Sequence, residues 1–331
     1  MGEKLIGILL NKVQTETFDD ISDKTCEFIK AFRQKGPVVG LDVYTGDMID
    51  LRRKYGGRYR QSDIEFSDMD ILFMGAVGMS TPHRVTALTN DMPEFLALYE
   101  KAQAEAIPTH NPFNVVQDFV GKQYLLRLQQ AGIPVVPTTK IGSLDDLLHC
   151  PPGIVKPLVS ERGIGTEVVD QLNEQQKIAL YERFGSGNFY GTEQGLIYQP
   201  YMNGFIERGE RKLMVVDEEI VLPRIHTLGS YDGEGRPVMA WGRDQTQVDV
   251  NPYNPSVKEQ DLVRDIQGWL DNNGYNPSFY RVDIVTDANE NPYVSELEML
   301  NPSPATEDFI YVGRRDLVDD FMNKLYASIN R

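Results

Sequence analysis

Short hydrophobic runs and one stretch of helical spacing alternate along the first third of the chain. Residues 4–10 form an apolar run typical of a buried strand, and further apolar runs follow at 37–45 and 70–77. The hydrophobic positions of residues 19–35 recur with the period of a helix instead. This order predicts a small α/β domain with a mainly parallel sheet. The loop at 75–83 follows the carboxyl end of a strand, where open α/β sheets bind ligands, although a plain connecting loop is an equally good interpretation.

The middle of the chain predicts a second unit of mixed helices and strands. A helix is expected from about 114 to 130, and Gly132 is a typical stop for it. The elements expected after it are a strand at 153–159, a glycine-containing loop at 160–166, a strand at 166–170, a helix at 173–184 and a strand at 195–202. Together they form an α+β unit of their own.

The last part of the chain predicts strands around a single helix. From about residue 203, strand patterns alternate with one amphipathic helix near 256–272, and a hairpin-like segment follows at 279–300. No repeats or low-complexity tracts occur. We therefore expect three structural units, at 1–113, 114–197 and 198–331.

The composition narrows the function classes. The chain has 331 residues, of which 41% are hydrophobic and 25% charged, as in globular proteins of two or three domains. Its formal charge of −16 repels nucleic acid and anionic membranes, and no run of about 18 apolar residues predicts a membrane span. Only Cys26, Cys150 and four scattered histidines are present, which indicates neither a disulfide framework nor a zinc site. A reducing, cytoplasmic location is the simplest expectation.

The loop Ser160–Thr166 combines features that suit phosphate binding. Gly163 and Gly165 leave backbone N–H groups unobstructed, and Lys156 supplies a positive charge on the strand that leads into the loop. No Gly-Lys-Ser/Thr sequence and no immediate helix follow, so this is not a Walker loop. Taken alone, a Gly-x-Gly between two strands is most often only a turn.

Three acidic residues in the hairpin-like segment indicate a metal site. Glu296 and Glu298 are two apart and therefore share one face of a strand. A symmetric hairpin that pairs Thr286 with Tyr293 also puts Asp283 opposite Glu296. Carboxylates so close to one another repel in a sheet unless a divalent cation such as Mg²⁺ binds them.

A solvated acidic face is the competing interpretation of this segment, and it agrees with the overall charge. Arg281 is expected on the same face as Asp283. We also expect Val294 and Leu300 to flank Glu296 on its own face. That arrangement indicates a buried or cleft position, and it slightly favours the metal.

Two cations form a third candidate group. Lys212 and Arg224 lie in two expected strands that a turn at 217–219 separates. Exposed cations on strands usually serve solubility alone. In so acidic a chain they become candidates for binding anions.

Several of these features occur in an order that resembles the ATP-grasp superfamily, and within it the glutathione-synthetase and RimK type of carboxylate–amine ligases. The features are Lys122, Lys156-Pro157, the glycine loop, IYQPYM, RVDIV and SELEMLNPS. No single motif is decisive, but their order and spacing from about residue 108 to 310 are specific together. The resemblance implies an α/β ATP-grasp fold of α+β subdomains. Its parts are a Rossmann-like pre-ATP-grasp domain at 1–113, a central lid subdomain at 114–197 and a C-terminal subdomain with the metal site at 198–331.

The resemblance implies that ATP binds between the two ATP-grasp subdomains. Lys122 matches a helix lysine that contacts the nucleotide phosphates, Lys156 matches the lysine of the K-P strand, and Ser160–Thr166 matches the mobile loop over the phosphates. The nucleotide-binding residues implied are Lys122, Lys156, Ser160, Gly163, Ile164, Gly165, Gln199, Pro200, Tyr201 and Met202, with Ile154 as a further apolar wall and Glu207 at the ribose.

The resemblance also assigns roles near the reacting groups. Lys212 and Arg224 match cationic positions that face the transferred phosphate and the substrate, and they are the implied catalytic residues. Asp283, Glu296 and Glu298 match the ligands of Mg²⁺, which Mn²⁺ can replace.

Three departures from the family pattern affect the choice of substrate. Glu298 stands where such members commonly have Asn, which keeps an oxygen ligand and adds negative charge. Lys212 replaces the usual arginine and loses bidentate anion binding. The glycine-rich substrate loop is replaced by the segment 229–255, which puts glutathione in doubt as the product. His226 lies just before that segment, and it is a candidate for substrate selection or an ordinary surface residue.

The resemblance implies an ATP-dependent carboxylate–amine ligase that forms an amide or peptide bond through an acyl phosphate. The implied partners are a small carboxylate and an amine, such as an amino acid or short peptide, with no nucleic acid and no membrane, and a homo-oligomer stays open. A non-catalytic ATP-binding protein on the same fold is the main alternative. An enzyme of another class that binds a different phosphorylated cofactor is the third.

Overall fold

The structure, a computed structural model, describes most of the chain from residue 97 onward and parts of the segment before it. The residues described are 5–10, 37–42, 48–55, 58–61, 63–73, 97–160, 165–189, 192–226, 229–231, 237–239, 251–299, 309 and 312–329. The helix predicted at 19–35 and the loop at 75–83 lie outside these ranges. Within them, every helix is too short or too polar to cross a membrane.

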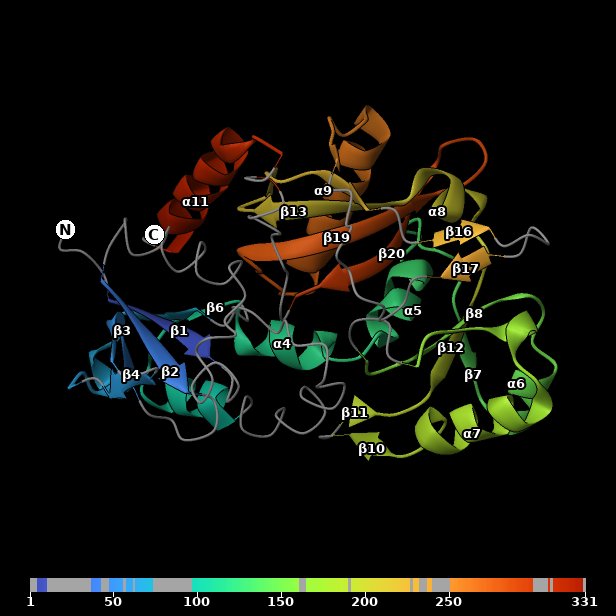
Figure 1. Ribbon diagram of the computed structural model, residues 1–331, viewed down its shortest axis with the longest axis horizontal. Helices are drawn as coiled ribbons and strands as arrows, with labels where there is room; N and C mark the ends of the chain where they lie inside the picture. Colours follow the sequence, from blue (N-terminus) through green and yellow to red (C-terminus); the bar gives the residue numbers. More distant parts are fainter. Residues whose placement is uncertain are drawn as a thin grey trace.

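The N-terminal part is built on a sheet of six strands in the order β4-β3-β2-β1-β5-β6 (Figure 1). β1 (Ile6–Leu10) runs parallel to β2 (Val38–Asp42) and β5 (Ile71–Phe73), and β5 runs parallel to β6 (Thr109–His110). The antiparallel hairpin of β3 (Met48–Tyr55) and β4 (Arg58–Gln61) extends the β2 edge. The parallel strands β1, β2 and β5 agree with the prediction, whereas the largely polar hairpin has no apolar run that would have predicted it.

The segment expected as one helix at 114–130 forms two helices, α4 (Phe113–Phe119) and α5 (Gln123–Gln130). The backbone N–H of Lys122 donates to the carbonyl of Leu158, 2.8 Å away, instead of continuing the helix. The prediction of one helix was wrong because the apolar spacing continues through this break. Buried side chains of both helices belong to the same large core as those of the C-terminal sheet.

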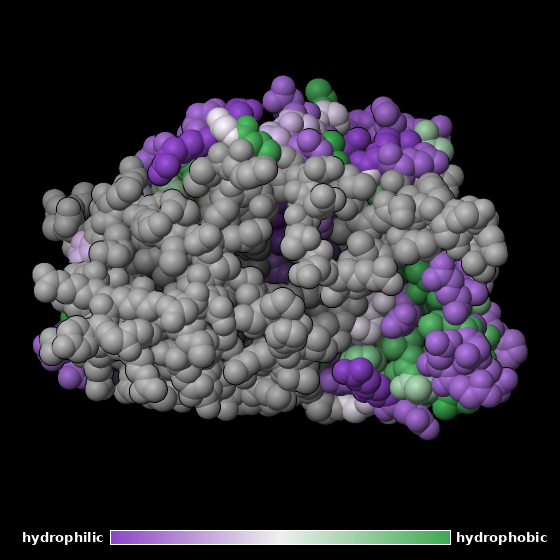
Figure 2. Space-filling model, in the orientation of Figure 1, coloured by the Kyte–Doolittle hydropathy of each residue, from purple (hydrophilic) through white to green (hydrophobic). Residues whose placement is uncertain are grey.

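A four-stranded antiparallel sheet in the order β7-β12-β8-β9 forms a separate small unit, the lid sheet. Its strands are β7 (Thr139–Ile141), β12 (Leu196–Pro200), β8 (Gly153–Pro157) and β9 (Glu167–Val168), and its helices are α6 (Leu144–Leu148), α7 (Glu174–Phe184) and the short η3 (Val169–Gln171). The lid sheet has a core of its own around Leu147, Val155 and Leu196. Around α6 and α7 its visible surface is mainly hydrophilic with smaller apolar areas (Figure 2).

The ends of the lid helix α7 follow from local chemistry. Asn173 accepts from the backbone N–H of Gln176, and the Gln176 side chain accepts from the backbone N–H of Asn173. This capping box starts the helix at the predicted position. A two-stranded hairpin of β10 (Asn188–Phe189) and β11 (Thr192–Glu193) then leads back to the lid sheet.

The C-terminal sheet is antiparallel and has the order β18-β15-β13-β19-β20, with β14 paired to β13. The strands are β13 (Glu210–Val216), β14 (Glu219–Ile220), β15 (Arg224–His226), β18 (Asn251–Pro252), β19 (Phe279–Thr286) and β20 (Pro292–Glu298). The pair β16 (Gly229–Tyr231) and β17 (Pro237–Met239) lies apart from it. Helix α9 (Val257–Asn272) covers one face of the sheet (Figure 1).

Two helices of this part were not predicted. The helix expected at 256–272 is confirmed, and Ser256 begins it with a capping box. However, α8 (Asn203–Arg208) and α11 (Arg315–Ile329) are also helical, so the prediction of a single helix after residue 203 was wrong. The Phe321 ring of α11 lies 5.8 Å from the ring of Phe279 on β19, so burial against the sheet stabilises this last helix.

Candidate active site

Four charged residues form a row across the C-terminal sheet. Arg224 lies opposite Lys212, Lys212 opposite Asp283, and Asp283 opposite Glu296. Residues directly opposite on neighbouring strands point to the same face of a sheet. The row Arg224–Lys212–Asp283–Glu296, called the charged row below, therefore brings both predicted catalytic residues beside two predicted metal ligands.

The period of two places more charged residues on the same face. Glu210 lies two residues from Lys212 on β13, and Arg281 lies two residues from Asp283 on β19. Glu298 lies opposite Arg281. The other face is mainly apolar and packs against α9, with an ion pair of 3.0 Å between Arg211 and Glu259.

The predicted pairing of Asp283 with Glu296 is confirmed, but the hairpin that produces it is not symmetric. Thr286 pairs with Pro292 instead of Tyr293, and the register then shifts by one residue between Asp283 and Ile284. The shift is a β-bulge with Ser295 as its extra residue. Without the bulge, Asp283 would lie opposite Ser295.

The bulge also corrects the expected surroundings of Glu296. Val294 pairs with Ile284, and both are completely buried in the core that α9 covers. Val294 therefore lies on the face opposite to Glu296, and the prediction that it flanks Glu296 was wrong. The other predicted neighbour, Leu300, lies outside the described residues.

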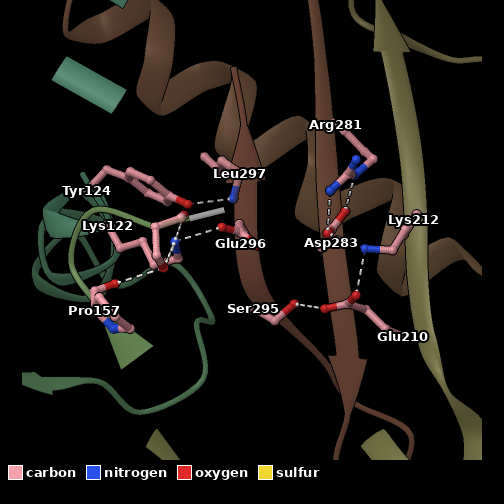
Figure 3. A network of polar contacts seen from close by, with 11 residues as sticks. Lys122, Tyr124, Pro157, Glu210, Lys212, Arg281, Asp283, Ser295, Glu296 and Leu297 are labelled. Atoms are coloured by element: carbon pink, nitrogen blue, oxygen red, sulfur yellow. Dashed lines mark hydrogen bonds and ion pairs between the residues drawn. The ribbon is translucent and has the colours of Figure 1, made fainter. Parts of the chain in front are cut away.

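Asp283 is the centre of a buried ion network (Figure 3). Its Oδ1 accepts from Arg281 Nε at 2.6 Å, and its Oδ2 accepts from Arg281 at 2.9 Å and from Lys212 Nζ at 2.6 Å. Burial raises the pKa of Asp283, but the cations of Arg281 and Lys212 outweigh burial and hold that pKa well below its usual range. Asp283 is therefore ionised throughout the neutral pH range.

Lys122 joins Glu296 to the base of the glycine loop (Figure 3). Its Nζ lies 3.1 Å from Glu296 Oε1 and donates to the backbone carbonyl of Ser160 at 2.7 Å. Burial raises the pKa of Glu296, but Lys122 together with Lys156 and Arg281 lowers it below its usual range. Two residues beyond Lys122, Tyr124 accepts the backbone N–H of Leu297 through its hydroxyl, which anchors β20 beside Glu296.

Lys156 lies on β8, where the lid sheet approaches the charged row. Burial lowers its pKa, and the carboxylates of Glu296, Glu210 and Asp283 counteract that shift. Within the described residues no side chain pairs directly with Lys156, so its ammonium depends on more distant carboxylates. An incoming anion would give this buried ammonium a direct partner.

The glycine loop is described at its two ends. Ser160 lies at one end, and its hydroxyl donates weakly to the carbonyl of Pro157 at 3.4 Å. Gly165 at the other end has a φ of 68°, and a Cβ there would lie 2.6 Å from the Phe184 ring. Gly165 is therefore required by conformation and by packing. Gly163 and Ile164 lie outside the described residues.

The predicted adenine-binding residues lie at the junction of the lid sheet and the C-terminal sheet. Gln199 is buried and donates to Thr138 Oγ1 at 2.9 Å, and Ile154 is its partner across the sheet. Pro200 pairs with Gly153 at the end of β12.

Met202 packs with Val136, Phe205 and Val285 in a small apolar cluster. Because Val285 is two residues from Asp283, this cluster borders the charged row.

Two predicted nucleotide-binding residues have partners within the protein. The hydroxyl of Tyr201 donates to Asp170 at 2.7 Å, which ties the junction to the lid sheet. Glu207 is exposed on α8 and lies 3.4 Å from Arg208. Arg208 in turn donates to Thr286 at 3.0 Å, so α8 is fastened to the β19–β20 hairpin. A role for Glu207 at the ribose stays a prediction.

The candidate metal ligands present hard oxygen donors, which suit Mg²⁺. Within the described residues, however, no group of three or more carboxylate, histidine or cysteine side chains is close enough to share one ion. At Asp283, moreover, both carboxylate oxygens already accept hydrogen bonds from Arg281 and Lys212. Glu296 likewise lies 3.1 Å from Lys122 Nζ, so Asp283 and Glu296 fit a metal only when Lys212 and Lys122 move away from them.

Three residues of the network were not among the predicted site residues. Arg281 is Asp283's bidentate partner, and the R-x-D spacing on a strand was the signal for it. Glu210 bonds Lys212 Nζ at 2.6 Å, and the spacing of two along β13 was its signal. Ser295 donates to Glu210 at 2.8 Å. The sequence signal for Ser295 was weaker. Val294 and Leu297 are both apolar and both belong in the core, although a spacing of three puts two residues on opposite faces of a regular strand.

His226 lies opposite Glu210 at the edge of the site. Burial lowers its pKa to about 3, and the cations of Lys212 and Arg224 add to the shift. At neutral pH the imidazole is therefore uncharged.

The lowered carboxylate pKa values predict acid sensitivity. Asp283 and Glu296 have lower pKa values in the folded protein than in the unfolded chain, so they stabilise the fold above about pH 4 to 5. That stabilisation is lost as the pH falls further. The urea midpoint should therefore drop steeply below about pH 5, and Asp283→Asn should make the drop shallower. Asp261→Asn, at an exposed carboxylate on α9, is the control and should keep the wild-type slope.

Comparison with known proteins gives no match to any protein-family model and none to a curated protein sequence. Solved structures do match over nearly the whole chain. A D-cycloserine synthetase has a TM-score of 0.64 at 15% identity, covering 96% of this chain and 99% of its own. A D-alanyl-alanine synthetase A from Vibrio cholerae has a TM-score of 0.61 at 12% identity, covering 100% of both chains.

A RimK domain ATP-grasp protein from Sphaerobacter thermophilus is also similar, with a TM-score of 0.58 at 15% identity over 97% of this chain and 98% of its own. At these identities the likeness establishes the arrangement of the chain and leaves the chemistry to the residues of the site. The resemblance inferred from the sequence motifs is confirmed at this level: the protein has the ATP-grasp fold.

Proposed function

We propose that the protein is an ATP-dependent ligase that joins a small carboxylate to an amine. The observation that supports this most is the charged row, which faces Lys122 and Lys156 beside the glycine loop. Fixed cations and carboxylates at one place stabilise the charge of a phosphoryl group during its transfer. The same cations offset locally the −16 charge of the chain, which otherwise repels a nucleotide.

The lysines and the glycine loop are proposed to bind the phosphates of ATP. Lys122 donates to the carbonyl of Ser160 at the start of the loop, so a phosphate that attracts Lys122 also changes the position of that end of the loop. The loop then covers the phosphates and excludes water, which would otherwise hydrolyse a reactive acyl phosphate. The apolar cluster around Met202 is proposed as the wall for the adenine ring.

Glu296 and Glu298 are the proposed holders of Mg²⁺ or Mn²⁺, which when bound neutralises phosphate charge. Lys212 is proposed to leave Asp283 for the transferred phosphoryl group, which frees an oxygen of Asp283 for the same ion. Arg224, opposite Lys212, is proposed as the second cation of the charged row. Arg281 keeps Asp283 ionised and in place during this exchange.

The proposed reaction has two balanced steps. A carboxylate oxygen attacks the γ-phosphorus of ATP, the bond from that phosphorus to the β–γ bridging oxygen breaks, and ADP leaves with its electron pair. The amine then attacks the carbonyl carbon of the acyl phosphate. Phosphate leaves with the former carboxylate oxygen, and the amine loses a proton to give the amide.

The amine and carboxylate are proposed to be amino acids or short peptides. The name of one structural neighbour, D-alanyl-alanine synthetase, denotes a dipeptide product. His226 faces this region as an uncharged imidazole and is a candidate contact to the substrate.

Amine-dependent release of ADP from a panel of amino acids and short peptides tests the proposal. Once a pair of substrates is found, the carboxylate is labelled with ¹⁸O. One ¹⁸O atom per turnover should appear in the released phosphate, because the carboxylate oxygen becomes a phosphate oxygen. ATP binding without ADP release for any pair would favour the non-catalytic alternative, and unlabelled phosphate would exclude the acyl phosphate.

A further inference from the structure

We propose that Ser295 and Glu210 are positioning residues whose hydrogen bond places Glu296, and not Ser295, opposite Asp283. The bond joins Ser295 Oγ to Glu210 Oε1 at 2.8 Å, and both residues are buried. Its consequence for metal binding rests on the function proposed above. Its effect on the sheet does not.

The hydrophobic pattern requires a bulge but leaves its position open. Val294 and Leu297 are three residues apart, yet both lie in the core under α9. Side chains alternate along a regular strand, so one extra residue must lie between them. Either residue 295 or residue 296 satisfies the pattern equally well.

The two positions of the bulge have different consequences for the site. With the extra residue at 295, the carboxylate of Glu296 lies beside Asp283 and reaches Lys122. With the extra residue at 296, Ser295 would take the place opposite Asp283. Glu296 would then be displaced by one residue, roughly 3 Å along the strand. Such a displacement is large compared with the tolerance of a metal–ligand distance.

Glu210 selects the first arrangement because it has a second fixed contact. Its Oε2 lies 2.6 Å from Lys212 Nζ, which is also bonded to Asp283. The carboxylate is thereby held on β13, across β19 from β20, with one oxygen directed at the bulge (Figure 3). A buried carboxylate oxygen that loses its donor is costly, so the arrangement that supplies Ser295 is favoured. The same residue thus positions Glu296 through Ser295 and positions Lys212 directly.

The test uses the full chain with Ser295→Ala, Ser295→Thr, Glu210→Met and the control Ser278→Ala. Ser278 is matched because its hydroxyl also makes a part-buried contact, 2.7 Å from His110, next to the start of β19 and away from the charged row. The first measurement is amide hydrogen exchange at residues 294–298 without metal or nucleotide. Exchange should be about 10-fold faster or more in Ser295→Ala and unchanged in Ser278→Ala.

The second measurement is Mn²⁺ binding by electron paramagnetic resonance, in the presence of a non-hydrolysable ATP analogue. Ser295→Ala should weaken Mn²⁺ binding about 10- to 100-fold, as removal of a group that orients a metal ligand does. Ser295→Thr keeps the hydroxyl and should restore most of the affinity. The double variant Ser295→Ala/Glu210→Met should lose no more than the worse single variant, because each change removes the same bond between the two side chains.

The two measurements separate the failure of this inference from that of the proposed function. Unchanged amide exchange in Ser295→Ala overturns the role of the pair in the bulge. Faster exchange with wild-type Mn²⁺ affinity overturns its role in positioning the ligands. If the wild-type protein binds no Mn²⁺, the proposed metal site is wrong, and the exchange measurement still decides whether the pair holds the bulge.

Discussion

Replacing Glu296 by Gln should lower the rate of ADP release by about 100- to 1,000-fold while the protein stays folded. The change keeps the shape of the side chain and removes the negative charge that we assign to the metal. Glu296 is 30% exposed, so its substitution disturbs the core little. The loss should appear mainly in kcat, because the metal acts on the group being transferred.

The control for Glu296 is another glutamate paired with a lysine. Glu193 lies 2.7 Å from Lys140 on the surface of the lid sheet, and Glu193→Gln should leave turnover unchanged. Unfolding midpoints of both variants show whether the fold is kept. Raising the Mg²⁺ concentration should restore part of the activity of Glu296→Gln, since a weakened site fills at higher metal. Wild-type turnover in Glu296→Gln would contradict the metal assignment.

Replacing Arg281 by Met should destabilise the protein by about 3 kcal/mol at neutral pH. Arg281 donates twice to Asp283, whose side chain is 1% exposed. Its removal therefore leaves a buried carboxylate that has Lys212 as its one charged partner among the described residues. Arg281→Lys should cost less, because it keeps the charge and loses the bidentate geometry. Urea unfolding at pH 7 measures both effects.

Two further variants show whether the loss comes from the buried charge. Adding Asp283→Asn to Arg281→Met should recover part of the lost stability, since the unpaired charge is then gone. Arg264→Met removes an arginine that pairs with Asp261 on the exposed side of α9, and it should not change the unfolding midpoint measurably. An Arg281→Met protein as stable as the wild type would show that Lys212 alone suffices for Asp283.

The hydrophobic pattern predicted much of the fold because burial acts on each element separately. The parallel strands β1, β2 and β5, and the helices α7 and α9, follow from apolar runs and capping residues in the local sequence. The break between α4 and α5 does not, because the bond from Lys122 to the carbonyl of Leu158 joins segments that are distant in sequence.

The candidate site likewise combines features that follow from local spacing with features that depend on distant segments. The spacing of two between Glu296 and Glu298, and between Arg281 and Asp283, is a local property, and it alone indicates that each pair shares a face. Whether these pairs lie beside Lys212 and Arg224 depends on which strands are neighbours in the sheet.

The sequence by itself determined that this chain carries lysines, a glycine loop and carboxylates in the order typical of the ATP-grasp fold. Only the tertiary structure decided that Ser295 is the extra residue of a bulge and that Glu296 therefore lies opposite Asp283. It also decided that Asp283 bonds to Arg281 and Lys212 rather than lying free for a metal. The physical reason is that spacing along a strand defines a face, whereas register and ion pairing depend on contacts between β13, β19 and β20 that no local pattern encodes.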